Sequence, residues 1–262
     1  MTVGKYLEVA RINFINSFAY IGDRFMSSVF IAIIIFILVC LWKVIYAANI
    51  PIKGFTFLMI IWYLVMTESL VTSFGGIIEQ IGLEVQSGDI TNHMNKPYSY
   101  FLFKYATSMS YAVVNFFITF VLSAIIVLLF VGPIFVPVIY IPFILISVLL
   151  AITLHFVMMY CIGISAFFLE DVKSFAFIYD KIVFTVGGML LPLEFFPAMV
   201  QGVAGFLPFS YVAYHPAKLF VMFSFSSFFS VVMVQLVWIV IFSLLAIFLY
   251  RIYTRRLAVN GG

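Results

Sequence analysis

The sequence predicts an all-α membrane protein with six transmembrane helices, and two observations lead to this fold class. Hydrophobic residues make up 66% of the 262 residues and charged residues only 9%, whereas ordinary soluble domains are about 45–50% apolar. Several apolar runs reach about 20 residues, the length that crosses a hydrocarbon layer of about 30 Å as a helix. Transmembrane strands would instead alternate polar and apolar residues over about 10 positions, so we expect helices.

Six apolar runs are predicted to span the membrane, and together they form one transmembrane domain over residues 1–262. The runs cover residues 25–46, 55–78, 105–131, 138–168, 174–192 and 226–250. Proline, glycine or charge interrupts the chain between them, at residues 49–54, 79–104, 132–137, 169–173 and 192–216. Such residues end membrane helices, so these segments are the predicted connections.

The distribution of basic residues predicts that both termini are cytoplasmic in the plasma membrane. With this orientation, ten of the 13 Lys and Arg residues lie on the cytoplasmic side: Lys5, Arg11, Arg24, Lys96, Lys104, Lys173, Lys181, Arg251, Arg255 and Arg256. Three lie on the other side: Lys43, Lys53 and Lys218. Cytoplasmic loops carry the excess of Lys and Arg. Residues 79–104 are therefore expected inside and residues 193–222 outside.

Residues 1–24 are predicted to form a helix that lies in the membrane interface. Leu7, Ala10, Phe14, Phe18 and Ile21 recur at helical spacing, with polar residues between them. An amphipathic helix of this kind packs its apolar side against lipid. A solvated or disordered tail is the alternative.

The stretch "LEVQSGDITNHMNKPYSYF", residues 83–101, is unusually polar for this chain. Gly88 suits the left-handed end of one helix, and Asp89 suits the start of another, where its carboxylate would accept backbone N–H groups. Ile90 and Met94 would share one face of that short helix, which Pro97 would end. A capped amphipathic helix is suited to docking on a partner, whereas the alternative is a solvated loop.

Charged groups near this short helix are candidates for surface ion pairs. Glu84, Asp89 and Lys96 lie close together in the sequence. Exposed ion pairs contribute only about 0–1 kcal/mol, so the apolar face is expected to supply more of any docking energy.

Motifs for local chemistry are absent from the sequence. It contains neither G-x-x-x-x-G-K-[ST] nor G-x-G-x-x-G, so we expect no nucleotide cofactor on this chain through those loops. The three histidines fall on separate segments without metal-ligand spacing, and no metal is expected. The basic residues are not clustered with stacking aromatics, which argues against nucleic acid as a partner.

Glu68 and His155 are two ionisable residues that fall within predicted spans and are candidates to line a substrate path. Groups of this kind at membrane depth are usual functional candidates, because an unpaired charge in hydrocarbon is costly. A structural hydrogen bond is the alternative for both residues. Two further classes of protein stay open: a membrane-embedded enzyme that acts on lipid, with Glu68 or His155 as its base, and a non-catalytic channel or assembly subunit.

Two stretches together resemble the membrane subunits, or permeases, of type 2 ABC exporters. The first is the polar stretch, where Glu84, Gly88, Asp89, Ile90, Met94 and Pro97 match the family's cytoplasmic motif. The second covers residues 165–220, where the matching positions are Gly187, Gly188, Pro192, Pro197, Leu207, Pro208, Phe209, Ser210 and Tyr211. Drug exporters of this family usually carry Gly-Thr-Leu-Glu at this point of the cytoplasmic motif. This chain carries Gly88-Asp89-Ile90-Thr91 there and so departs from the drug-exporter form.

The resemblance implies a fold and a set of partners. It implies an interfacial N-terminal helix, a cytoplasmic coupling helix between spans 2 and 3, and an outer re-entrant hairpin, residues 193–222, between spans 5 and 6. ATP and Mg²⁺ would be bound by a separate ATPase, present in two copies, that docks on residues 84–97. A second permease, identical or homologous, would complete the transporter in membrane lipid.

The outer hairpin would then act as a gate over the substrate path. Glu194 is the first residue of the hairpin to test for a role in gating. The apolar interior favours export of an amphiphilic or hydrophobic substrate, although the same composition also serves simply to keep helices in a bilayer.

Overall fold

The structure of the chain is a computed structural model that describes residues 4–19, 21–48, 54–94, 96–168 and 172–260. Throughout these ranges the chain forms helices and turns, and no β-strand occurs in them. The predicted break at 169–173 and the one at 49–54 lie largely outside the described residues.

Twelve α-helices and three short 3₁₀ helices follow one another along the described chain. The α-helices are α1 Gly4–Ala19, α2 Ile21–Ala47, α3 Phe57–Val71, α4 Ile77–Gln86, α5 Ile90–Met94, α6 Tyr100–Phe130, α7 Ile141–Ile164, α8 Lys173–Thr185, α9 Ala198–Phe206, α10 Pro208–Val212, α11 Tyr214–Val221 and α12 Phe225–Asn260. The 3₁₀ helices are η1 Val138–Tyr140, η2 Ser165–Phe167 and η3 Leu193–Phe195.

Four helical segments in the described ranges are long and apolar enough to cross a membrane. They are Phe25–Ala47, Tyr100–Phe130, Val138–Phe167 and Phe225–Ile252. These agree closely with the first, third, fourth and sixth predicted spans. The second and fifth predicted spans form shorter helices, so the predicted number of six spans is not confirmed.

The second predicted span is divided between α3 and α4. The 15 residues of α3 extend about 22 Å, less than the hydrocarbon layer of about 30 Å. α3 ends where the N–H and hydroxyl of Thr72 both donate to the carbonyl oxygen of Glu68, at 3.0 and 2.6 Å. Gly76 then takes a left-handed conformation, with φ of 59°, immediately before α4. The apolar run therefore contains a turn that its hydrophobicity conceals.

The fifth predicted span contains the 13-residue helix α8 followed by a turn. The N–H groups of Val186 and Gly187 both donate to the carbonyl oxygen of Ile182, at 2.8 and 3.0 Å. Gly188 follows with φ of 73°, which L-residues with a side chain rarely adopt. Two glycines thus end this helix before it reaches the length of a span.

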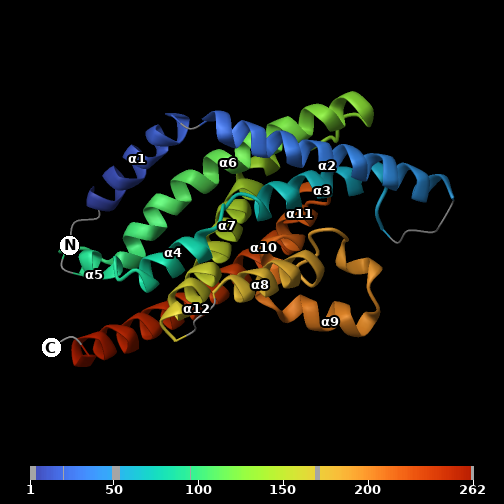
Figure 1. The fold of residues 1–262 in the computed structure, drawn as a ribbon. Helices are drawn as coiled ribbons and strands as arrows, with labels where there is room; N and C mark the ends of the chain where they lie inside the picture. The colour runs from blue at the N-terminus through green and yellow to red at the C-terminus, as the bar shows by residue number, and fades with distance from the viewer. Residues whose placement is uncertain (1–3, 20, 49–53, 95, 169–171, 261–262) are drawn as a thin grey trace.

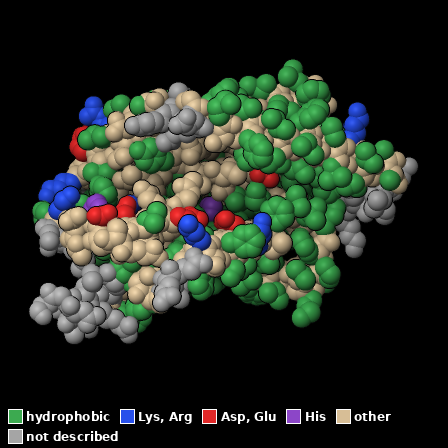
Figure 2. All heavy atoms as spheres, viewed as in Figure 1, with side chains coloured by type: hydrophobic (Ala, Val, Ile, Leu, Met, Phe, Trp, Pro, Cys, Tyr) green, Lys and Arg blue, Asp and Glu red, His purple; other side chains and the backbone are tan. Residues whose placement is uncertain are grey.

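Both ends of the chain lie towards the same end of the helical bundle, where α5 also lies (Figure 1). In the space-filling view, charged side chains lie at that end and around the middle of the visible face, and hydrophobic side chains cover much of the other half (Figure 2). Phe30, Ile37, Leu129 and Leu244 are among the exposed apolar residues of the long helices. A surface of this composition is typical of contact with lipid.

Two hydrophobic clusters fill the interior. One joins α2, α3 and α11 and includes Trp42, Ile60 and Tyr63. The other joins α4, α7 and α12 and includes Ile81 and Phe156. The short helices α4 and α11 are thereby held against the long membrane-spanning helices.

The prediction of a helix within residues 1–24 is confirmed over α1, and α1 packs against α6. The hydroxyl of Ser110 on α6 donates to the carbonyl oxygen of Ala10 at 2.9 Å. Leu7, Phe14 and Phe18 are exposed, as a lipid-facing side requires, while the side chain of Ile21 lies outside the described residues. The location of α1 in the membrane interface stays a prediction.

Candidate functional site

Gly88 ends α4 in the way that the sequence predicts. Its φ is 78°, and the N–H groups of Ser87 and Gly88 donate to the carbonyl oxygens of Leu83 and Val85 at 2.8 and 3.2 Å. Glycine adopts this left-handed geometry without steric cost. The chain can therefore leave α4 and begin α5 after only three residues.

The sequence predicts that the carboxylate of Asp89 caps the start of α5. In the structure this carboxylate makes a different contact. The carboxylate oxygen Oδ2 accepts a hydrogen bond from the hydroxyl of Ser87 at 2.8 Å. The N–H groups of Thr91 and Asn92 donate instead to the backbone carbonyls of Gly88 and Asp89, both at 3.0 Å. The tight turn already satisfies these donors, and the Asp89 side chain stays exposed.

A buried ion pair fastens this segment to α6. Glu84 at the end of α4 forms a salt bridge with Lys104 on α6, and their side chains are only 21% and 6% exposed. The hydroxyl of Tyr100 donates to the other carboxylate oxygen of Glu84 at 2.7 Å. By sequence, Glu84 is a candidate for a surface ion pair, whereas the structure pairs it inside its own protein. The sequence placed Lys104 at the start of an apolar run, where only the fold reveals its partner.

Ile90 does not offer the apolar docking face that the sequence predicts. Its side chain is fully buried in the chain's own core, in the cluster that contains Tyr100 and Tyr160. The side chain of Met94 lies outside the described residues. α5 ends at Met94, three residues before Pro97. Ile90 is thus an anchor that holds α5 on the bundle.

The exposed side of the segment is mainly polar. It is formed by Asp89, Thr91, Asn92, Lys96 and Pro97.

Aromatic residues hold the return from α5 to α6. Nδ1 of His93 and the hydroxyl of Tyr98 are hydrogen-bonded at 2.7 Å, and the N–H of Ser99 donates to the hydroxyl oxygen of Tyr6 on α1 at 2.8 Å. Burial lowers the pKa of His93 from its ordinary value. The polar segment, α1 and α6 therefore form one connected structure at this end of the bundle.

Glu194 belongs to a polar cluster in the predicted outer hairpin. Its Oε1 accepts hydrogen bonds from the hydroxyl of Tyr214 at 2.6 Å and from Nζ of Lys218 at 2.5 Å. Lys218 also donates to the hydroxyl oxygen of Tyr214 at 2.8 Å. Burial opposes ionisation of Glu194, but the two hydrogen bonds outweigh it and lower the pKa of the carboxyl. Glu194 is thus held as a carboxylate that joins η3 to α11.

Gly187 and Gly188 form a turn that is clamped between α3 and α11. The hydroxyl of Tyr63 donates to the carbonyl oxygen of Gly188. The N–H of Tyr214 donates to the carbonyl oxygen of Gly187 at 3.1 Å. Thr67 on α3 reaches the carbonyl oxygen of Met189 at 2.8 Å. A Cβ on Gly187 would lie 2.3 Å from the carbonyl oxygen of Val183. Both glycines are therefore required by the geometry of the turn.

Three prolines separate the short helices of the hairpin, as predicted. Pro192 and Pro197 directly precede η3 and α9, and Pro208 is the first residue of α10. The hydroxyl of Tyr211 donates to the carbonyl oxygen of Gly205 at 3.1 Å, which ties α10 to α9. The hairpin is a chain of short, cross-linked helices. Its location as a re-entrant hairpin on the outer side of the membrane stays a prediction.

Glu68 and His155 are buried in the bundle, at 4% and 2% exposure. The ring of His155 lies edge-on to Phe74 and stacks on Tyr179, with centroids 5.4 and 5.7 Å away. Within the described chain, no hydrogen bond joins Glu68 to His155. The structure therefore gives these residues no shared site.

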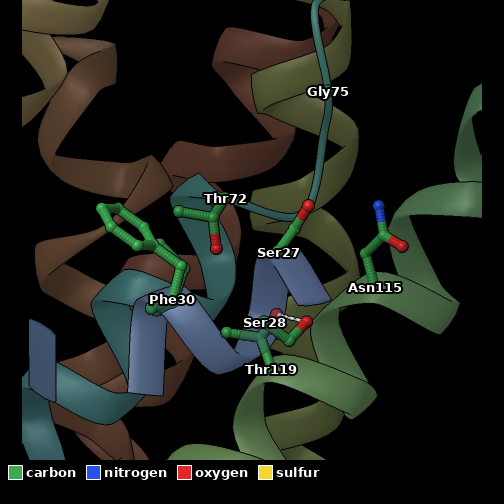
Figure 3. Close-up of a pocket in the computed structure, with 8 residues that line it drawn as sticks. Ser27, Ser28, Phe30, Thr72, Gly75, Asn115 and Thr119 are labelled. Atoms are coloured by element: carbon green, nitrogen blue, oxygen red, sulfur yellow. Dashed lines mark hydrogen bonds between the residues drawn. The ribbon is translucent and has the colours of Figure 1, made fainter. Parts of the chain in front are cut away.

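A polar cavity of about 450 Å³ lies beside the end of α3, between α2 and α6 (Figure 3). Its polar lining comes from Ser27, Ser28, Thr72, Asn115 and Thr119. The hydroxyls of Ser28 and Thr119 are hydrogen-bonded at 2.9 Å. None of the described residues that line this cavity is charged.

A second cavity of about 290 Å³ shares Gly75 and Asn115 with the first. Both border the turn between α3 and α4, and irregular backbone within a membrane needs cover from protein or a water-filled space. Sequence reasoning missed this site because it searched for charged groups. The spacing of Asn115 and Thr119, one helical turn apart, is the signal that could have indicated it.

The helical bundle, its apolar surface and its membrane-spanning helices define a multi-pass membrane protein. The model of the family described as ABC-2 family transporter protein matches residues 30–261. Because the match covers most of the sequence, this chain belongs to the ABC-2 transporter family, whose members are membrane components of ABC transporters. No curated protein matches the chain.

Proposed function

We propose that this chain is one permease half of an ATP-driven exporter in the plasma membrane. Its partners are a second permease, identical or homologous, and two copies of a cytoplasmic ATPase that bind ATP and Mg²⁺. Membership of the ABC-2 family supports the transport role. The absence of both nucleotide-binding loops from the sequence supports a separate ATPase.

The observation that carries this proposal is the firm attachment of an exposed polar segment to the bundle. The buried pair of Glu84 and Lys104 and the buried side chain of Ile90 hold the segment from α4 to α6 in place. Movement of an ATPase that binds this segment would therefore be passed to α4 and α6 as a rigid-body displacement. A solvated loop would absorb the same movement.

The docking surface proposed here is polar, in contrast to the apolar face that the sequence predicts. Asp89, Thr91, Asn92 and Lys96 are exposed, whereas Ile90 faces the interior. Charge and hydrogen bonding would set the position of the ATPase, and complementary charges of this kind contribute more to specificity than to affinity.

The orientation proposed has both termini in the cytoplasm. Two observations support it: the termini and α5 lie at one end of the bundle (Figure 1), and most Lys and Arg residues belong to that side by sequence. The hairpin with Glu194 then faces outwards and acts as a gate over the substrate path. The cargo that the interior favours is amphiphilic or hydrophobic, with the polar cavity beside Thr72 and Asn115 offering hydrogen bonds to its polar part.

Co-purification with native partners in mild detergent tests the proposal. We expect an ATPase with a phosphate-binding loop to co-purify, and we expect Asp89→Arg and Asn92→Arg to release it. Glu8→Arg is the matched control for Asp89→Arg, because it makes the same charge change at an exposed residue of α1. Retention of the ATPase by both segment variants would overturn the docking proposal.

The same purified preparation also tests the two alternative functions that the sequence leaves open, a lipid-modifying enzyme and a channel or assembly subunit. A lipid-modifying enzyme predicts activity without any ATPase and its loss on replacement of Glu68 or His155. A channel or assembly subunit predicts conductance or partner binding that no nucleotide-binding chain affects. Neither outcome is expected.

A further inference from the structure

A cavity of about 330 Å³ lies between α11 and the start of α12. Its polar lining comes from Tyr211, His215, Lys218, Ser226, Ser227 and Ser230. α12 continues from Ser230, which lines the cavity, to Asn260, so about 45 Å of helix separates this cavity from the C-terminal end of α12. The cavity is therefore distant from the polar segment around α5.

Neighbouring residues indicate that the cavity lies at the membrane interface. The spanning segments Val138–Phe167 and Phe225–Ile252 both begin at this level. Aromatic rings cluster there: Tyr140 stacks on Phe223 with centroids 4.3 Å apart, and Phe143 contacts Phe225 at 5.3 Å. Aromatic residues are enriched where the hydrocarbon meets the headgroups. A ligand in this cavity would thus lie at headgroup depth.

The start of α12 supplies hydrogen-bond donors and a favourable field for an anion. A helix N-terminus carries a charge equivalent of about +0.5. The hydroxyl oxygen of Ser224 accepts a hydrogen bond from the N–H of Ser227 at 3.1 Å. Its carbonyl oxygen accepts one from the N–H of Phe228 at 2.9 Å. Among the described hydrogen bonds none uses the N–H of Ser226, and the side chains of Ser226 and Ser230 are exposed.

Lys218 adds a positive charge and one further N–H donor to the cavity. Its ammonium has three N–H donors, and the described structure uses two, towards Glu194 and Tyr214. Glu194 and Tyr214 do not line this cavity. Because Glu194 balances the charge of Lys218, the site suits an anion of a single charge better than a dianion.

His215 has an unsatisfied polar atom at the same place. Its ring stacks on Tyr211 with centroids 4.1 Å apart, and its buried Nε2 has no hydrogen-bond partner in the described chain. Burial lowers the pKa of His215 to about 4. The neutral imidazole keeps one N–H, and the residue forms part of the cavity wall beside Lys218.

We propose that this cavity binds the phosphodiester group of a phospholipid. A phosphodiester carries one negative charge, accepts several hydrogen bonds and lies at the depth at which the cavity opens. Lys218, the hydroxyls of Ser226 and Ser230, and the start of α12 hold it. This proposal is independent of the transport function.

Thermal unfolding of the detergent-purified protein tests the proposal with three additions. They are phosphatidylglycerol, digalactosyl diacylglycerol with the same acyl chains but no phosphate, and inorganic phosphate. We expect phosphatidylglycerol alone to raise the unfolding midpoint of the unmodified protein substantially. An equal rise with the galactolipid would overturn the role of the phosphodiester, and an equal rise with inorganic phosphate would show a free-anion site in place of a lipid site.

Two sets of variants locate the effect. Ser226→Leu with Ser230→Leu fills the cavity and removes both hydroxyls, and Lys218→Gln with Glu194→Gln removes the cation without leaving its carboxylate unpaired. Each should weaken phosphatidylglycerol binding at least about tenfold, as expected for loss of hydrogen bonds to a charged group. Ser243→Leu is the control, about 20 Å further along α12. If both pairs bind the lipid as tightly as this control, the site is not the one proposed.

Discussion

Gly188 joins the end of α8 to α3, because its carbonyl oxygen accepts the hydrogen bond from Tyr63. Its φ is 73°, and an added Cβ would lie 2.9 Å from the Cβ of Tyr214. We expect Gly188→Ala to lower the free energy of unfolding by about 1–3 kcal/mol, the cost of a residue held in a disfavoured conformation.

Unfolding midpoints in detergent measure this effect, with Gly202→Ala as the control. Gly202 lies in α9, where an added Cβ meets no atom within 4 Å. An alanine in an open helical position gains stability, by up to about 1 kcal/mol. Equal effects of the two substitutions would contradict the role given to Gly188.

His215 predicts a dependence of stability on pH. Burial, reinforced by Lys218, lowers its folded pKa to about 4, whereas the unfolded value is about 6.5. The unfolded chain therefore binds more protons between these values, and stability falls as the pH drops through this window. His215→Gln should reduce the slope of the unfolding midpoint against pH between about pH 6.5 and about pH 4. An unchanged slope would show that His215 is not a source of this dependence.

At the scale of elements, one buried ion pair fixes the segment from α4 to α6. Lys104→Met leaves the carboxylate of Glu84 without its cation, and loss of one partner from a buried pair costs about 3–5 kcal/mol. We expect a matching fall in stability in unfolding experiments. Glu84→Gln combined with Lys104→Met should recover much of it, because no unpaired charge then remains. A double variant as unstable as the single one would contradict this explanation.

The four long spanning helices could be predicted from the sequence because hydrophobic length decides them. The first predicted span, 25–46, matches Phe25–Ala47, and the last, 226–250, lies within Phe225–Ile252. The turn after α3 could not be predicted, because Phe74 and two glycines keep the run apolar while Gly76 reverses the backbone. Hydropathy measures affinity for lipid and not backbone conformation.

The candidate sites were predictable only in part. Gly88, Gly187 and Gly188 were identified because turns restrict which residue types they accept, and the structure gives each a geometric reason. The burial of Ile90 and the pairing of Glu84 with Lys104 depend on how α4, α5 and α6 pack. Periodicity within five residues of α5 cannot tell which side of a helix meets its own protein.

At the scale of the whole molecule, both chain ends and α5 lie at one end of the bundle, where many charged side chains also lie (Figures 1 and 2). The connected polar and aromatic contacts around Glu84, Tyr100 and Tyr6 join α1, α4 and α6 there. A force applied at this end would therefore reach several membrane helices together. This is the physical basis for proposing that a separate ATPase acts on it.

Site-specific photo-crosslinking in the native membrane tests this proposal most directly. A benzoylphenylalanine in place of Asn92, exposed on α5, should form an adduct with a Walker-motif ATPase. The same group in place of Phe135, exposed between α6 and η1, should not. ATPase adducts from position 92 alone would support docking on this segment, whereas an intact complex with no adduct from position 92, or with equal adducts from both positions, would contradict it.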